Sequence, residues 1–247
     1  MDEIQKNHGN KYKFKLFGES VFILFHLPPL MLNNVNISVA LFKEKWYLFS
    51  MLLNVALLAG GQSRRFGSDK ALANFRGKPL IEYISEKFIR EGFNVSVISK
   101  DVTKYLNVLS GSVEHVEDIF EQQCPLAGII TALRHFRSPV FVISTDAPAV
   151  PSEAVKAVLN ALDGYDAAVP DADGKIHPLI AAYAPSCLDI FMKQFESGNF
   201  RLRDALASLN TIYLDDSFFS SLGFDSSIFS NINRREDMEL FRKNISL

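Results

Sequence analysis

The sequence predicts an α/β fold whose sheet is mostly parallel and doubly wound, and three observations support this prediction. The chain has 247 residues, 48% of them hydrophobic, which is enough to bury one large core. Short apolar runs alternate with amphipathic stretches of about 10–15 residues, as in successive β–α–β units. Polar segments directly follow two of the apolar runs, at the strand ends where open α/β sheets bind ligands.

Composition excludes several classes of function. The formal net charge is −2 and the isoelectric point is near 6.2, so a strongly basic nucleic-acid surface is not expected. The two cysteines, Cys124 and Cys187, are too few for a four-thiolate zinc site or a disulfide framework. We expect two free thiols in a reducing cytosol, a cytoplasmic location, and neither nucleic acid nor membrane as a partner.

The first fifty residues differ from the rest, with six lysines, four acidic residues and six of the 21 phenylalanines. Their apolar run at 21–25 is closely followed by Pro28 and Pro29, whereas a membrane-spanning helix needs about 20 apolar residues. A signal peptide also fits poorly, because no small-residue cleavage site follows the run. Residues 1–50 could be a small packed appendage, a poorly ordered leader or the product of a start codon placed too early; we favour the last two. A complete domain is predicted at 51–247.

The first half of this domain alternates strands with helices. Its predicted elements are a buried strand at 53–58, a glycine-rich loop, a helix at 79–92, strands at 95–99 and near 113–115, and a helix after Pro125. The first helix is well marked because Leu80, Ile84 and Phe88 recur on one face and Gly92 follows its end.

The second half continues this pattern. Its predicted elements are a strand at 140–144, a helix capped by Ser152 and running through Asp163, a turn at 171–174, a strand at 177–183, helices near 185–196 and 201–209, an extended segment at 211–214 and a last helix from Arg235. The run at 140–144 is almost entirely apolar, which is typical of a strand buried on both faces. Because the chain contains no internal repeat, we predict a single domain.

A segment rich in glycine and arginine follows the first strand. Residues 58–70 read Leu-Ala-Gly-Gly-Gln-Ser-Arg-Arg-Phe-Gly-Ser-Asp-Lys. Gly60 and Gly61 lack Cβ atoms, so their backbone amides can closely approach a ligand. Cations such as Arg64 and Lys70 suit a triphosphate, whose charge must be neutralised before attack. The segment matches neither the Walker loop nor the dinucleotide fingerprint, and taken alone it could equally be a solvated turn.

An aspartate follows the strand at 140–144. Asp146 lies in the sequence Ser-Thr-Asp-Ala-Pro, just beyond a buried strand, where a carboxylate is well placed to hold Mg²⁺ through oxygen. Such a metal would stabilise the charge that grows on the phosphates during transfer. Taken alone, an aspartate here is more often a turn former or helix cap.

The segment at 58–70, read as Leu-Ala-Gly-Gly-x-Ser-x-Arg-x-Gly-x-Asp-Lys, resembles the signature loop of the molybdenum cofactor guanylyltransferases, the MobA family. The resemblance covers about residues 51–247. It continues, in the family's order, through the motifs at 77–80, 125–128, 145–148, 177–178 and 231–233. It implies a single-domain, Rossmann-like nucleotidyltransferase fold. It also implies transfer of GMP from Mg-GTP to the terminal phosphate of molybdopterin or Mo-molybdopterin, with release of pyrophosphate.

The resemblance also implies roles for individual residues. The implied nucleotide-binding residues are Leu58, Ala59, Gly60, Gly61, Lys70, Asp118 and Asp146. The candidate catalytic residues are Lys70, Asp146 and Arg64, and Asp146 is the candidate ligand of Mg²⁺. Asp118 resembles an aspartate that contacts the guanine nucleotide. The candidates on the pterin side are His177, Arg201, Asn231 and Asn233.

The sequence departs from the family at two places. Cys124 stands where the family often has glycine, and Ser99-Lys100-Asp101 stands where it has a nucleotide-contacting asparagine. Lys100 could reach a phosphate instead. Two alternatives remain open, a cytidylyl- or sugar-nucleotide transferase on the same fold and a non-catalytic adaptor that binds GTP or pterin. Further partners could be molybdoenzyme apoproteins or other proteins of cofactor biosynthesis.

Overall fold

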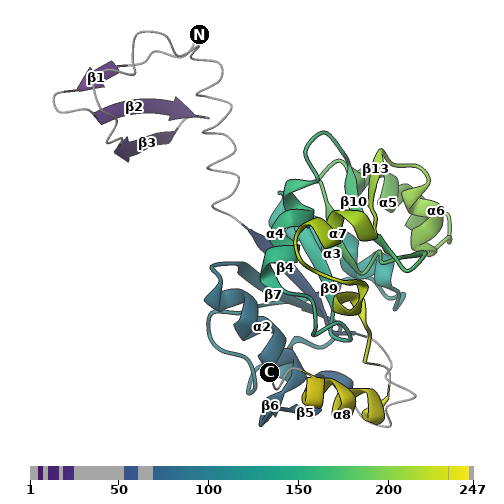
Figure 1. Cartoon of the computed structure of the whole chain (residues 1–247). Coiled ribbons are helices and arrows are strands. Elements are labelled where there is room, and N and C mark those ends of the chain that lie inside the picture. The colour runs from purple at the N-terminus through teal and green to yellow at the C-terminus, as the bar shows by residue number, and fades with distance from the viewer. Residues whose placement is uncertain are drawn as a thin grey trace. The chain divides into compact units, whose positions relative to one another are not determined.

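The structure, a computed structural model, describes residues 5–7, 11–16, 19–24, 53–60, 69–232 and 234–244. The chain forms two compact units, Met1–Met51 and Leu52–Leu247 (Figure 1). In the first unit, an antiparallel sheet is formed by β1 (Gln5–Asn7), β2 (Lys11–Leu16) and β3 (Glu19–Leu24).

The described part of the second unit is built on an eight-stranded sheet with the order β11-β10-β12-β9-β4-β7-β8, in which β13 also pairs with β10. The strands are β4 (Asn54–Leu58), β7 (Asn94–Ser99), β8 (Glu114–Glu117), β9 (Val140–Ser144), β10 (Ala167–Ala172), β11 (Lys175–Ile176), β12 (Ile180–Tyr183) and β13 (Thr211–Leu214). Parallel pairs join β4 to β7 and β9, β7 to β8, and β10 to β13. Strand β12 pairs antiparallel with β9 and β10, and β11 pairs antiparallel with β10. The predicted α/β fold with a mostly parallel sheet is confirmed.

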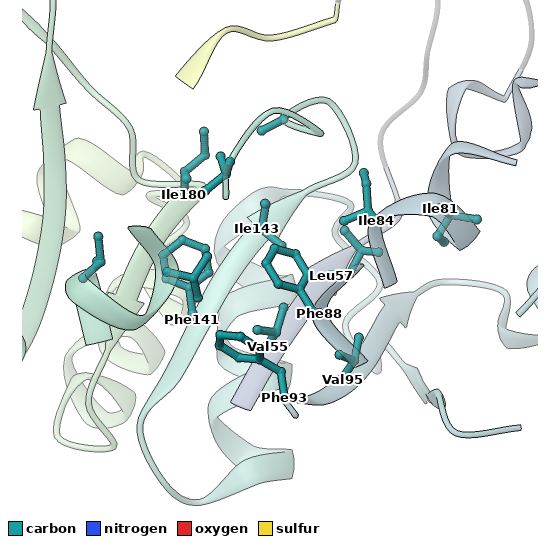
Figure 2. Close-up of a cluster of buried hydrophobic side chains, with 14 of the residues drawn as sticks. Val55, Leu57, Ile81, Ile84, Phe88, Phe93, Val95, Phe141, Ile143 and Ile180 are labelled. Carbon is teal, nitrogen blue, oxygen red and sulfur yellow. The ribbon is translucent and has the colours of Figure 1, made fainter. Parts of the chain in front are cut away.

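Helices pack on both faces of this sheet (Figure 1). One core contains residues of α2 (Leu80–Arg90), α4 (Ser152–Asn160), α7 (Asp216–Ser221) and α8 (Arg235–Asn244), and the other contains residues of α3 (Pro125–Phe136), α5 (Cys187–Glu196) and α6 (Leu202–Leu206). Alternate residues of a strand enter opposite cores: Val55 and Leu57 of β4 join the first and Ala56 the second. Figure 2 shows the first core, where Phe88 of α2 lies close to Leu57.

Short elements connect this framework to the candidate site. They are η2 (Lys70–Leu72), the hairpin of β5 (Asn74–Phe75) and β6 (Lys78–Pro79), η3 (Val102–Tyr105) and η4 (Ser226–Phe229). Helix α8 lies beside the β5–β6 hairpin (Figure 1), and the rings of Phe75 and Phe241 are 5.7 Å apart. The C-terminal segment therefore returns to the part of the domain that carries Lys70.

Two predicted element boundaries are wrong. The helix predicted with Ser152 as its cap and running through Asp163 instead has Pro151 at the N-cap and ends at Asn160. Pro151 is extended, with φ −75° and ψ 155°, so Ser152 is already the first helical residue. The chain then turns toward Gly164, whose φ is +79°, a conformation that favours glycine.

The region around His177 also differs from the prediction. The strand predicted at 177–183 begins only at Ile180, because the Ile180 N–H donates to the His177 carbonyl and closes a turn around Pro178. The turn predicted at 171–174 is confined to Asp173 and Gly174, and the residues before it belong to β10, which the sequence analysis missed along with α7. The other predicted helices and strands are present with slightly shifted ends.

Candidate active site

The glycine-rich segment at 58–70 and the segment that carries Asp146 meet because the strands before them, β4 and β9, are neighbours in the sheet. Leu58 at the end of β4 pairs with Ser144 at the end of β9, and the Thr145 N–H donates to the Leu58 carbonyl at 3.4 Å. The chain runs from β4 to β7 on one side and later returns to β9 on the other. The β4–β9 edge is therefore a topological switch point, where open α/β sheets bind ligands.

Lys70 and Asp146 face each other at this edge. The Lys70 Nζ lies 3.7 Å from Asp146 Oδ2, with 14% and 25% of the two side chains exposed. The same ammonium donates to the Ile232 carbonyl at 2.9 Å, and the Ile232 N–H donates to the Asp146 carbonyl at 2.8 Å. The C-terminal segment thus connects the two candidate catalytic residues, and both charges remain accessible to a ligand.

The Asp146 carboxylate suits a shared metal site. Its Oδ1 accepts a hydrogen bond from the Ser144 hydroxyl, which orients the carboxylate. No group of three or more His, Cys, Asp or Glu side chains that could hold a metal ion occurs among the described residues. One hard carboxylate is nevertheless sufficient for Mg²⁺, which keeps several waters and is held jointly by one or two carboxylates and substrate phosphates.

The start of the glycine-rich segment is held by other parts of the domain. The Ala59 N–H donates to the Ile98 carbonyl at 2.9 Å, and the Gly60 carbonyl accepts from the Gln123 side-chain amide. The Ala59 amide is therefore already paired, and a nucleotide could not use this donor without displacing the bond to Ile98. Two predicted residues of this segment, Gly61 and Arg64, lie outside the described residues.

Helix α3 approaches the end of β4 closely. A Cβ atom on Gly128 would lie 3.2 Å from Cδ2 of Leu58, which is closer than ordinary van der Waals contact. The Pro-Leu-Ala-Gly motif that starts α3 and the Leu-Ala-Gly-Gly motif that follows β4 are therefore in direct contact. The structure thus joins two of the motifs on which the resemblance to the family rests.

Asp118 lies in a network with Lys100. The Asp118 Oδ2 is 3.1 Å from Lys100 Nζ, and its Oδ1 accepts from the Phe120 N–H and the Thr131 hydroxyl at 3.2 and 3.3 Å. A carboxylate offers about four acceptor positions, so these three partners leave about one for a ligand. Contact between Asp118 and guanine stays a prediction. The positive charge next to this carboxylate is the Lys100 ammonium.

Three of the four predicted pterin-side residues, Asn231, His177 and Arg201, lie among the described residues. Asn231 is exposed and adjoins Ile232, so it lies next to the Lys70–Asp146 pair, whereas Asn233 is outside the described residues. The His177 ring stacks on Phe229 at 5.1 Å, and burial lowers its pKa, which favours the neutral ring at pH 7. Arg201 is exposed at the N-cap of α6, a helix that packs in the other core.

Sequence reasoning missed three supporting groups. Ser144 could have been noticed, because it precedes Asp146 by two positions and bears a hydroxyl. The Ile232 carbonyl could not have been found from the sequence, since every residue has a backbone carbonyl. The Tyr105 hydroxyl, which donates toward the Ala59 carbonyl and the Asp69 carboxylate, comes from a segment with no motif.

Comparison with known proteins identifies the family of this site. A family model described as "MobA-like NTP transferase domain" matches residues 55–212, which include Lys70 and Asp146. The chain belongs to the MobA-like NTP transferase family. It is therefore a nucleotidyltransferase, and the resemblance noted from the signature loop is confirmed.

Relatives of this MobA-like transferase carry more specific names. A "Probable molybdenum cofactor guanylyltransferase" from Thermococcus gammatolerans is 33% identical over 76% of this chain and 98% of its own length. A protein of the same name from Natranaerobius thermophilus is 28% identical over 77% of this chain and 95% of its own length. The crystal structure of molybdopterin-guanine dinucleotide biosynthesis protein A from Archaeoglobus fulgidus matches with a TM-score of 0.68 and 29% identity, covering 78% of this chain and 99% of that one.

None of the helices in the described part of this transferase is both long enough and apolar enough to cross a bilayer.

Proposed function

We propose that this chain is a molybdenum cofactor guanylyltransferase that transfers GMP from Mg-GTP to the terminal phosphate of molybdopterin or Mo-molybdopterin. The observation that carries the proposal is the 3.7 Å approach of the Lys70 ammonium to the Asp146 carboxylate at the β4–β9 edge. The names of the relatives from Thermococcus gammatolerans and Natranaerobius thermophilus support the choice of substrates.

The reaction forms one bond and breaks another. A terminal phosphate oxygen of the pterin attacks the α-phosphorus of GTP, and the bond from that phosphorus to the bridging oxygen breaks, so its electron pair leaves with pyrophosphate. A phosphate monoester is already anionic at neutral pH, and no strong general base is required. Catalysis then depends on in-line positioning and on neutralisation of charge.

Each residue of the pair has a separate task in this proposal. Lys70 binds phosphate oxygens of GTP through its ammonium group. Asp146, oriented by the Ser144 hydroxyl, holds Mg²⁺. When bound, the metal neutralises charge that develops on the phosphates. Arg64 is proposed to add a further cation, and the amides of Gly60 and Gly61 to approach the nucleotide.

Base selection is assigned to the contact between α3 and β4. Leu58 packs against Gly128, and Asp118 has about one acceptor position left for the N–H groups of guanine.

Asn231, next to Ile232, is proposed to face the pterin, with His177, Arg201 and Asn233 as further pterin-side candidates. The activity is assigned to residues 51–247, and we expect it in the cytoplasm, where an apoenzyme or another protein of cofactor biosynthesis would receive the product.

The test is release of pyrophosphate by the purified protein supplied with GTP, Mg²⁺ and molybdopterin. Asp146→Asn and Lys70→Ala should each lower turnover by about a hundredfold or more. The matched controls are Asp163→Asn and Lys193→Ala at exposed positions, which should turn over near the wild-type rate. Near-normal turnover of Asp146→Asn or Lys70→Ala would remove the role assigned to that residue.

The same protein distinguishes the alternatives. Mg-GTP should raise the melting temperature more than Mg-CTP does, since ligands that bind only the folded state stabilise it. A larger shift with CTP would indicate a cytidylyltransferase. Tight GTP binding without any release of pyrophosphate would indicate an adaptor.

A further inference from the structure

A buried tyrosine contacts both ends of the glycine-rich segment. The Tyr105 hydroxyl lies 3.2 Å from the Ala59 carbonyl oxygen, at the start of the segment, and 3.1 Å from Asp69 Oδ2, at its end. Both partners are acceptors, so the hydroxyl donates its one proton toward the two of them. Only 2% of the Tyr105 residue is exposed, and water competes little for these bonds.

The position of Tyr105 is set by the end of β7. The Asp101 carboxylate caps η3 by accepting from the Thr103 N–H at 2.9 Å and from the Thr103 hydroxyl at 2.6 Å. The Ser99 hydroxyl donates to the Asp101 carbonyl at 3.0 Å. Since β7 pairs with β4, this short helix brings Tyr105 back toward the residues that follow β4.

Asp69 links the Tyr105 hydroxyl to Lys70, because it contacts both the hydroxyl and the first turn of η2. Its Oδ1 accepts from the Ala71 N–H at 2.9 Å and so caps η2, which begins at Lys70. The Lys104 ammonium also pairs with the Asp69 carboxylate. A shift of Asp69 would therefore move the first residue of η2, whose ammonium reaches Asp146 and the Ile232 carbonyl.

We propose that Tyr105 is a positioning residue that ties Ala59 to Asp69 and thereby places Lys70 for binding the nucleotide phosphates. Burial and the neighbouring Asp69 carboxylate raise the pKa of Tyr105, so the hydroxyl keeps its proton throughout the working pH range. Tyr105 acts through Asp69 and Lys70 and does not touch the nucleotide in this proposal. The expected effect on catalysis rests on the proposed function, whereas the effect on η2 does not.

The experiment compares Tyr105→Phe, which removes only the hydroxyl, with Tyr165→Phe, which removes one from a tyrosine that is 38% exposed. In both proteins, NMR measures hydrogen exchange of the η2 amides of residues 71–73. Equilibrium dialysis measures the Kd of Mg-GTP, and kcat and KM are taken from pyrophosphate release. The Kd is measured again with each change combined with Lys70→Ala.

Tyr105→Phe is expected to speed exchange of the η2 amides and to weaken GTP binding about tenfold, whereas Tyr165→Phe changes neither. In the Lys70→Ala background, Tyr105→Phe should weaken binding less than about twofold, because the group through which it acts is gone. Unchanged exchange, or an equal loss of affinity in both backgrounds, would overturn the proposal.

Asp69→Ser is the second variant in case Tyr105→Phe does not fold. Its hydroxyl oxygen can still cap η2 by accepting from the Ala71 N–H, whereas it lacks the second oxygen that accepts from the Tyr105 hydroxyl. We expect the same faster exchange, and wild-type exchange would overturn the proposal. If the wild-type protein released no pyrophosphate, the proposed function would fail, while the exchange data would still decide the role of Tyr105.

Discussion

The Lys87 ammonium on α2 lies 2.6 Å from the carbonyl oxygen of Val150 and 3.0 Å from that of Pro148. Both carbonyls belong to the segment that follows Asp146. Helix α2 therefore holds the segment that carries the candidate metal ligand, in addition to covering one face of the sheet. Burial lowers the pKa of Lys87 to about 8.

This partly buried lysine predicts a particular pH dependence of stability. Between pH 8 and about 10.5, Lys87 is deprotonated in the folded state but protonated in the unfolded state, so the unfolded state binds more protons and the free energy of unfolding rises with pH. From pH 7.5 to 9.5 the contribution of Lys87 should rise by about 2 kcal/mol. Urea unfolding of the wild type and Lys87→Met at both pH values should show this difference.

An exposed lysine provides the control. Lys193→Met, on the surface of α5, is expected to keep the wild-type pH dependence. An equal pH dependence in the wild type and Lys87→Met would contradict the assignment to the buried ammonium.

The contact between Gly128 and Leu58 predicts that binding and stability respond differently to one methyl group. Gly128→Ala gains up to about 1 kcal/mol of helix propensity, which offsets the close contact with the Leu58 side chain. We expect the free energy of unfolding to change by less than about 1 kcal/mol, and the KM for GTP to rise several-fold because Leu58 must shift. Urea unfolding and steady-state kinetics measure the two effects.

Gly111→Ala is the matched control, because a Cβ atom at Gly111 meets nothing within 4 Å. It should leave the KM for GTP unchanged. A Gly128→Ala protein with an unchanged KM would show that the α3–β4 contact does not affect nucleotide binding.

The hydroxyl of Ser144 predicts an effect on metal dependence. It donates to the Asp146 carboxylate, and loss of such a supporting hydrogen bond typically lowers metal affinity 10- to 100-fold. Ser144→Ala should raise the Mg²⁺ concentration for half-maximal rate by about tenfold, with a much smaller effect on the rate at saturating Mg²⁺. Ser221→Ala, whose hydroxyl donates to the Phe218 carbonyl, should match the wild type.

Residues 51–247 are predicted to retain activity without the first fifty. The family match spans residues 55–212, and Leu52–Leu247 forms a compact unit by its internal contacts. A protein starting at Met51 should keep the kcat of the full chain, and its melting temperature should lie within a few degrees. A large loss of kcat with a preserved melting temperature would show that residues 1–50 contribute to the reaction.

Much of the fold could be predicted because local patterns were strong. Residues 140–143 form an unbroken apolar run and lie in the buried strand Val140–Ser144, and the apolar face of Leu80–Arg90 was evident from its spacing. The strand Ala167–Ala172 was missed because the two aspartates near its end suggested a turn. Pairing between strands overrode that local preference, as it commonly does in sheets.

By itself, the sequence determined the α/β class, the family and the identities of the candidate catalytic pair, because motifs and periodicity are local properties of the chain. Only the tertiary structure decided that Lys70 and Asp146 are 3.7 Å apart, that Ile232 connects them and that Tyr105 joins Ala59 to Asp69. These contacts depend on the order and register of β4, β7 and β9, and on the return of the C-terminal segment. Such long-range pairings are selected by packing of the whole core, which no short stretch of sequence encodes.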